Sequence, residues 1–219
     1  MSPQISERMK SLQSEIFDLY NNVASSQSEH PKIRSYAKAT DEHTRRVIGN
    51  IIIACRLMGC PLSDVLYASA ACHDIGRMKK KPADFQGDDN AWRTYRDNNH
   101  HTVSAEDCVE PLARNNFTEY EIGRISSLVE YHGIDIEKDA DIEVRMLQIA
   151  DKLDRLGVDG AKRLYDNRRN RGLSHDDSKS DAAATMKEAY QYLYNLGLSS
   201  RLSIYVKQKY EEGKEYSKI

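Results

Sequence analysis

The residues of this chain best suited to chemistry are an adjacent pair, His73 and Asp74, at the end of a small-residue apolar stretch, 65–72. Neighbouring side chains point in different directions along any regular element. A pair that shares one centre is therefore best placed at a helix end or a turn, where the backbone can aim both inward. Ile75 and Gly76 follow directly and supply such a turn. We expect His73 and Asp74 to face one site together.

Four further side chains could join this pair. Each lies on the apolar face of its own expected helix: His43, His101, His132 and Asp151. Three or four nitrogen and oxygen ligands that converge between helices are what a catalytic metal needs. Neutral imidazoles with carboxylates suit Mn²⁺, Fe, Co²⁺, Ni²⁺ or Zn²⁺ better than Ca²⁺, which prefers cages made only of oxygen.

The elements that must position these residues are helices. No β-alternation runs long enough for a strand, so the expected fold class is all-α. Helices are expected over 5–20 and 33–39, and then after caps at Asp41 and Thr118. Further helices are expected to begin at Ser63 or its neighbours and after Asp141. A break is expected at 59–61, and a loop or short lid-like insertion at 77–99, because that stretch is polar and contains Gly and Pro.

The C-terminal part of the chain carries fewer chemical signals. Residues 168–181 are strongly polar and predict a loop, and 185–212 predict a helical pair with a break at 195–197. We therefore expect three parts: an N-terminal helix and linker at 1–30, a metal-binding core at 31–165, and a polar loop with a C-terminal helical extension at 166–219. The amphipathic C-terminal helices could form a homodimer face.

Composition excludes several classes of function. The 219 residues carry a formal net charge of −2, which gives no electrostatic case for nucleic acid. No stretch approaches the roughly 20 apolar residues of a membrane span, and the first residues open no secretory segment. The four cysteines show no C-x-x-C spacing, so we expect reduced residues in a cytoplasmic protein.

Five short motifs occur in a fixed order. They are D-E-H at His43, C-H-D-I-G-R at 72–77, H-T-V-S-A at 101–105, Y-H-G at His132, and L-Q-I-A-D-K-L-D-R-L-G at 147–157. In this order and spacing, over roughly 30–165, the chain resembles the HD-domain metal-dependent phosphohydrolases, in particular the small stand-alone bacterial-type members. The resemblance implies a single-domain HD-type helical bundle with a C-terminal helical extension.

The resemblance also implies roles for the residues at the matching positions. His43, His73, Asp74 and Asp151 would hold a first metal. In two-metal members Asp74 would bridge to a second ion bound by His101 and His132, and both one and two ions remain open. A water molecule activated by the metal would attack a phosphate ester or anhydride, with a nucleotide as the expected substrate.

Several charged side chains could act on such a substrate. Arg77 follows the H-D-I-G turn at a position where related enzymes often carry a basic residue facing phosphate, although one-metal nucleotidases often have a glutamate there. Lys152 and Arg155 flank the last ligand and could reach the same anion, and Asp154 could orient a ligand or a water. The arginines at 163, 168, 169 and 171 could serve a triphosphate tail.

Each of these residues also has a simpler interpretation. His101 and His132 could only line the cavity, and His100 is expected to be solvated because it projects differently from His101. Arg77 and the lysines at 79–81 could be solvated surface residues. For the whole chain, the alternatives are a non-catalytic metal- or nucleotide-binding regulatory module and an HD-type di-iron oxygenase, which shares the same ligands.

Overall fold

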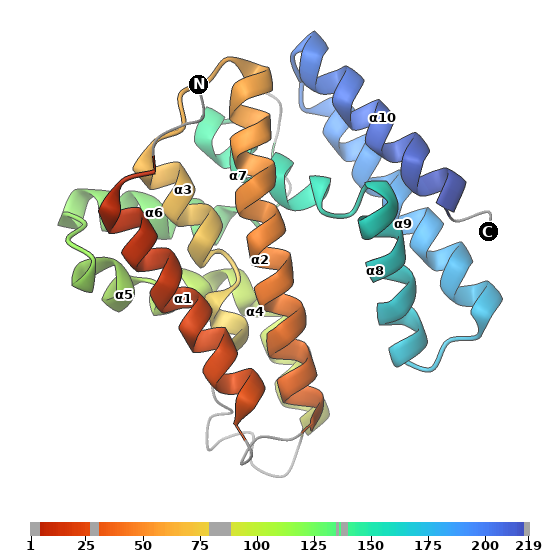
Figure 1. Cartoon of the computed structure of the whole chain (residues 1–219), viewed down its shortest axis with the longest axis horizontal. Helices are drawn as coiled ribbons and strands as arrows, with labels where there is room; N and C mark the ends of the chain where they lie inside the picture. Colours follow the sequence, from red (N-terminus) through yellow and green to blue (C-terminus); the bar gives the residue numbers. More distant parts are fainter. Residues whose placement is uncertain (1–4, 27–30, 79–88, 135, 137–139, 217–219) are drawn as a thin grey trace. The chain divides into compact units, whose positions relative to one another are not determined.

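The computed structural model describes residues 5–26, 31–78, 89–134, 136 and 140–216, with the backbone alone at 31–33 and 89–97. Over these residues the chain is helical and contains no strand, which confirms the predicted fold class. The elements are α1 Glu7–Ser25, α2 Pro31–Met58, α3 Asp64–Cys72, the short 3₁₀ helix η1 Ile75–Met78, α4 Asp89–Asp107, α5 Val109–Arg114, α6 Glu119–Tyr131, α7 Ile142–Leu153, α8 Gly157–Asn170, α9 His175–Asn195 and α10 Ser200–Tyr216 (Figure 1).

The helices form two compact units. The first contains residues 1–48 and 62–135, and the second contains 49–61 and 136–219, so α2 contributes its beginning to the first unit and its end to the second. Within each unit the residues lie close to one another. The boundaries predicted at 30/31 and 165/166 remain a prediction.

The first unit is built around α3, whose residues 66–72 are all buried. A helix that is buried on every side needs small or apolar residues all round, which explains its run of alanine, serine and cysteine. Helix α1 packs on it with a one-sided stripe that includes Met9, Leu12, Ile16 and Tyr20. Each such fully buried side chain contributes about 1.5–3 kcal/mol to folding. Helix α3 is thereby fixed with its C-terminal end inside the unit.

The predicted cap at Thr118 is confirmed, and the helices expected to begin near Ser63 and after Asp141 are capped by these two residues. The Ser63 side chain accepts a hydrogen bond from Leu66 N at 3.0 Å, and the Asp141 side chain accepts one from Glu143 N at 2.8 Å. Thr118 and Glu121 form a capping box, in which each side chain satisfies a backbone N–H of the other. The hydrogen bonds that cap a helix start join residues only two or three positions apart, so the sequence predicts them well.

The other predicted cap, Asp41, is wrong. Residues 33–39 and the helix that carries His43 form one continuous helix, α2, and Asp41 lies inside it. Its carboxylate pairs with Arg45 Nε at 2.9 Å, one turn later. An aspartate is compatible with a helix interior when a cation at i+4 faces it.

Two of the predicted loops are helical over most of their length. Within the expected loop at 77–99, residues 77–78 belong to η1 and 89–99 to α4, while 79–88 and their lysines lie outside the described residues. In the 168–181 stretch, α8 continues to Asn170 and α9 begins at His175. The polar residues fit these helix ends, because basic residues end α8 and Asp176 and Asp177 begin α9.

The second unit is formed by α7, α8, α9, α10 and the end of α2. Helix α10 packs on α8 and α9, and a Cβ at Gly213 would lie 2.8 Å from Gly157 O, so only glycine permits this approach. The predicted break between the last two helices is confirmed, with Gly197 at a φ of 66°. The Ser199 hydroxyl donates to Leu57 O at 2.8 Å, which ties this turn to the end of α2.

The cysteines are all free thiols, as predicted. Cys55, Cys72 and Cys108 are buried and Cys60 is partly exposed. Burial raises the pKa of the Cys55 thiol to about 11, which keeps it in the unreactive protonated form. Among the described helices, none is both long and apolar enough to cross a bilayer.

Candidate metal centre

The end of α3 aims His73 and Asp74 toward the same place. The helix stops at Cys72, and the chain turns at once into η1, where Arg77 N donates to Asp74 O at 3.0 Å. Gly76 lies directly against α4: its N–H donates to Ser104 Oγ at 2.9 Å, and a Cβ there would meet Ser104 N at 2.5 Å. The predicted turn is confirmed, and its glycine is needed for this close packing.

Three ligand-type atoms converge at this turn. His73 Nε2 lies 3.1 Å from His43 Nε2, and Asp74 Oδ2 lies 3.6 Å from His43 Nε2 and 3.8 Å from His73 Nε2. Two donor atoms that each bind one ion at about 2.1 Å are roughly 3.0–3.5 Å apart. The three atoms are therefore close to the spacing that a single metal ion requires.

The imidazole of His73 is oriented by the backbone. Its Nδ1 lies 2.9 Å from Ala70 O, and because a carbonyl can only accept, Nδ1 carries the hydrogen. In the neutral ring this leaves the lone pair on Nε2, the atom that faces His43 and Asp74. His132 has the same arrangement, since its Nδ1 contacts Val129 O. Such backbone partners fix the ring orientation of metal-binding histidines.

A second group of ligand-type atoms lies on the other side of Asp74. Asp74, His100 and His132 each offer one atom within 4.8 Å of the others, and His100 Nε2 lies 3.6 Å from Asp74 Oδ1. Asp74 and His132 are only 3% and 5% exposed. Oδ2 of this buried carboxylate thus lies near His43 and His73, and Oδ1 lies near His100.

The structure brings His100 to Asp74, where the sequence analysis expected His101. His100 is not solvated as expected, with a side chain only 16% exposed. His101 lies behind it, edge-on to His100 with ring centroids 5.5 Å apart, and its ring packs against Gly133. His100 lies on the same face of α4 as Val103 and Ser104, three and four residues later. These two residues contact Gly76, so this face points toward the turn that carries Asp74.

Arg77 contacts the same carboxylate. Its Nε lies 2.7 Å from Asp74 Oδ1, and its Nη1 donates to the Tyr36 hydroxyl at 2.7 Å. Sequence analysis missed Tyr36, although it lies seven residues before His43 and so on the same face of α2.

Asp74 is ionised in this environment. Burial by itself raises the pKa of Asp74, but Arg77 and then His73, His43 and His100 lower it, and the net pKa lies well below its usual value. The centre therefore offers an anionic oxygen to each set of histidines.

A sequence comparison agrees with this arrangement. The model of the HD domain family matches residues 40–156, more than half of the chain. The chain belongs to the HD domain family. No curated protein matches it. Among solved structures, a predicted HD superfamily hydrolase from an uncultured Thermotogales bacterium is 19% identical, with 84% of this chain and 92% of that chain covered and a TM-score of 0.47.

The remaining predicted site residues of the HD domain lie in the second unit. Asp151 is partly buried, with Arg155 Nη2 3.5 Å from its carboxylate, and Lys152 Nζ lies 5.3 Å from the centre of the Tyr192 ring. These contacts lie within the second unit. The roles of Asp151 as a ligand and of Lys152 and Arg155 at a substrate stay predictions.

Asp154 has a structural partner. Its side chain is 2% exposed, and its carboxylate lies 2.8 Å from Arg163 Nη2, which also donates to Asp154 O at 3.1 Å. Gly160 packs against the backbone of Arg155 and Asp154, closer than any Cβ would permit. The Asp154–Arg163 pair thus joins the end of α7 to α8, and a part for Asp154 in catalysis stays a prediction.

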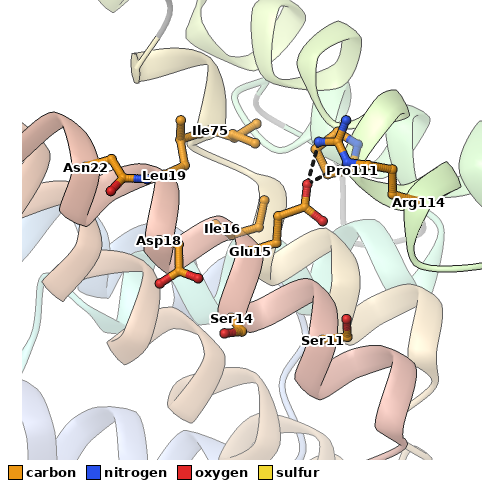
Figure 2. Close-up of a pocket in the computed structure, with 10 residues that line it drawn as sticks. All are labelled: Ser11, Ser14, Glu15, Ile16, Asp18, Leu19, Asn22, Ile75, Pro111 and Arg114. Carbon is orange, nitrogen blue, oxygen red and sulfur yellow. Dashed lines mark hydrogen bonds and ion pairs between the residues drawn. The ribbon is translucent and has the colours of Figure 1, made fainter.

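A surface groove of the first unit lies apart from these ligands. It has a volume of about 490 Å³ and is lined by α1 residues with Ile75, Pro111 and Arg114 (Figure 2). Glu15 and Arg114 form an ion pair there, drawn dashed in Figure 2, and Arg114 also contacts Glu110. Its lining contains Ile75, the residue after Asp74, but none of the histidines of the centre.

Proposed function

We propose that this HD domain protein is a metal-dependent phosphohydrolase that cleaves a phosphate ester or anhydride, with a nucleotide as substrate. The observation that supports this proposal most strongly is the position of Asp74. It is a buried, ionised carboxylate with histidine nitrogens facing both of its oxygens. Arg77 lies at Oδ1, whereas Oδ2 faces the ring nitrogens of His43 and His73, which are 3.1 Å apart. Three such electron-pair donors in a buried place are favourable when a cation lies between them.

The donor set fits a divalent transition metal. His43, His73 and Asp74 would hold the ion, and we propose Asp151 as a further ligand, as the family motif implies. Imidazole nitrogens with carboxylate oxygens suit Mn²⁺, Fe²⁺, Co²⁺, Ni²⁺ or Zn²⁺. When bound, such an ion lowers the pKa of a coordinated water and neutralises charge on phosphoryl oxygens.

The protein's own residues would orient the metal ligands and bind the substrate. The carbonyls of Ala70 and Val129 hold the His73 and His132 rings with Nε2 toward the site. His100 and His132 lie beside Asp74 and could donate hydrogen bonds to phosphate oxygens. Lys152 and Arg155 are proposed to neutralise the substrate's negative charge, since charge-assisted bonds to phosphate are strong.

The test is a substrate panel assayed with several divalent ions. Nucleoside mono-, di- and triphosphates, cyclic nucleotides and a chromogenic phosphate ester would be incubated with Mn²⁺, Co²⁺, Ni²⁺ or Zn²⁺, with phosphate and pyrophosphate detected separately. We expect release from at least one nucleotide, abolished by chelator. Oxygen uptake by iron-loaded protein without phosphate release would instead indicate an oxygenase, and binding without turnover a regulatory module.

A matched pair of variants assigns the chemistry. Asp74→Asn keeps the size of the side chain but removes its charge, and we expect turnover to fall at least about 100-fold. Asp64→Asn changes an aspartate at the start of α3 that pairs with Arg8 instead, and it should retain turnover. Equal activity in both variants would contradict the proposed site.

A further inference from the structure

We propose that Arg77 occupies the place of a second cation beside Asp74, so that the centre binds one metal ion while Arg77 is present and two when it is removed. This inference rests on the proposed metal centre. It concerns how many ions that centre holds, which the family resemblance leaves open. The residues that carry it are Asp74, Arg77 and Tyr36, with His100 and His132 as the ligands of the blocked position.

The two oxygens of Asp74 have different neighbours. Oδ2 lies 3.6 Å from the His43 ring and 3.8 Å from the His73 ring. Oδ1 has the guanidinium of Arg77 at 2.7 Å and the His100 ring at 3.6 Å. A cation held by Oδ1 together with His100 and His132 would share that oxygen with the guanidinium. At the first metal position, formed by Oδ2, His43 and His73, Arg77 does not compete with an ion.

The guanidinium is held in place from two sides. Tyr36, on α2, accepts a hydrogen bond from Nη1 at 2.7 Å, while Nε faces Asp74. The backbone beneath it is fixed too, because Arg77 N donates to Asp74 O and Gly76 packs without space against Ser104. Arg77 therefore cannot leave Asp74 without breaking its contact to Tyr36.

Electrostatics then disfavours a second ion. A divalent cation a few ångströms from a fixed guanidinium is repelled strongly where little water screens the two charges. The arginine side chain stays charged at any physiological pH, so the repulsion does not relax. With Arg77 present, His100 and His132 would contact a phosphate oxygen or water in place of a second ion. With Arg77 replaced by a neutral residue, the same two rings and Oδ1 form a second metal site.

The experiment counts bound ions in the full-length protein. Wild type, Arg77→Gln and Arg8→Gln would be dialysed against Mn²⁺ and measured by elemental analysis, with EPR to distinguish isolated from adjacent Mn²⁺ ions. Arg8→Gln removes an ion-paired arginine from the same unit without touching Asp74. We expect one ion per chain in wild type and in Arg8→Gln, and two adjacent ions in Arg77→Gln. The second ion should bind at least about tenfold more tightly in Arg77→Gln than in wild type.

Other results overturn the inference. Two tightly bound ions in wild type would show that Arg77 blocks nothing, and a single ion in Arg77→Gln would show that something else limits the count. No ion in wild type would instead overturn the proposed metal centre itself. If Arg77→Gln does not fold, Tyr36→Phe decides: it releases one side of the guanidinium, and tighter binding of a second ion supports the inference while wild-type binding overturns it.

Discussion

His43 Nε2 and His73 Nε2 lie 3.1 Å apart although the residues are separated by 30 positions and belong to different helices. Two ring nitrogens at this distance either share one proton or bind one cation between them. We therefore expect His43→Ala to weaken metal binding at least about 100-fold while leaving the helical fold intact. Calorimetric titration with Mn²⁺ and circular dichroism measure the two properties separately.

The control for this prediction is His175→Ala. His175 is exposed in the second unit, where its Nδ1 contacts the Tyr165 hydroxyl at 2.8 Å. It should leave metal affinity unchanged. Equal affinity in His43→Ala and wild type would remove His43 from the ligand set.

Gly76 should tolerate no side chain. Because a Cβ would meet Ser104 N at 2.5 Å and Val103 at 2.8 Å, Gly76→Ala must move η1 away from α4. We expect a loss of about 1–3 kcal/mol in unfolding free energy together with weaker metal binding, since Asp74 would move with η1. Gly123→Ala is the matched control: nothing lies within 4 Å, and helix propensity predicts a gain of up to about 1 kcal/mol. Urea unfolding compares the two, and equal stability would contradict the packing argument.

The Asp154–Arg163 pair should be a stability element of the second unit. Asp154 is almost fully buried and Arg163 is 25% exposed on its side chain. Arg163→Gln removes the guanidinium 2.8 Å from this buried carboxylate, and we expect it to cost about 3 kcal/mol. Arg169→Gln, at an exposed position near the end of α8, should cost less than about 0.5 kcal/mol. If both variants unfold at the same denaturant concentration as wild type, the pair does not stabilise the unit.

The capping carboxylate Glu121 predicts a pH dependence of stability. The hydrogen bond from Arg8, followed by the backbone of Thr118, lowers the pKa of Glu121 from 4.5 to about 2. A lowered pKa in the folded state means that Glu121 stabilises the protein fully above pH 4.5 and loses this contribution as the pH falls toward 2. Glu121→Gln should therefore be less stable than wild type at pH 6, with the difference shrinking at pH 3. A stability difference between Glu121→Gln and wild type that grows as the pH falls would contradict this prediction.

Local features of the fold were predictable from the sequence. Ser63, Thr118 and Asp141 each satisfy a backbone N–H two or three residues away, so their role is visible in neighbouring residues. The turn after α3 is also local, because His73 and Asp74 directly precede Ile75 and Gly76. Asp41 was misjudged since the same residue type can cap a helix or pair with Arg45 within one.

The details of the centre depend on packing between helices, which the sequence pattern does not specify. His100 and His101 differ by one position on α4, and the contact of Gly76 with Ser104 decides which ring faces Asp74. Tyr36 carried no signal of its own, because a tyrosine on a helix is usually explained by burial. Its part follows only from the position of Arg77.

The most direct measurement is a crystal of the Mn²⁺-loaded protein with anomalous diffraction collected at the metal edge. The account predicts an anomalous peak within about 2.3 Å of His43 Nε2, His73 Nε2 and Asp74 Oδ2, with Asp151 completing the ligands. A metal bound elsewhere on the chain, or no peak at these three atoms at saturating Mn²⁺, would contradict it.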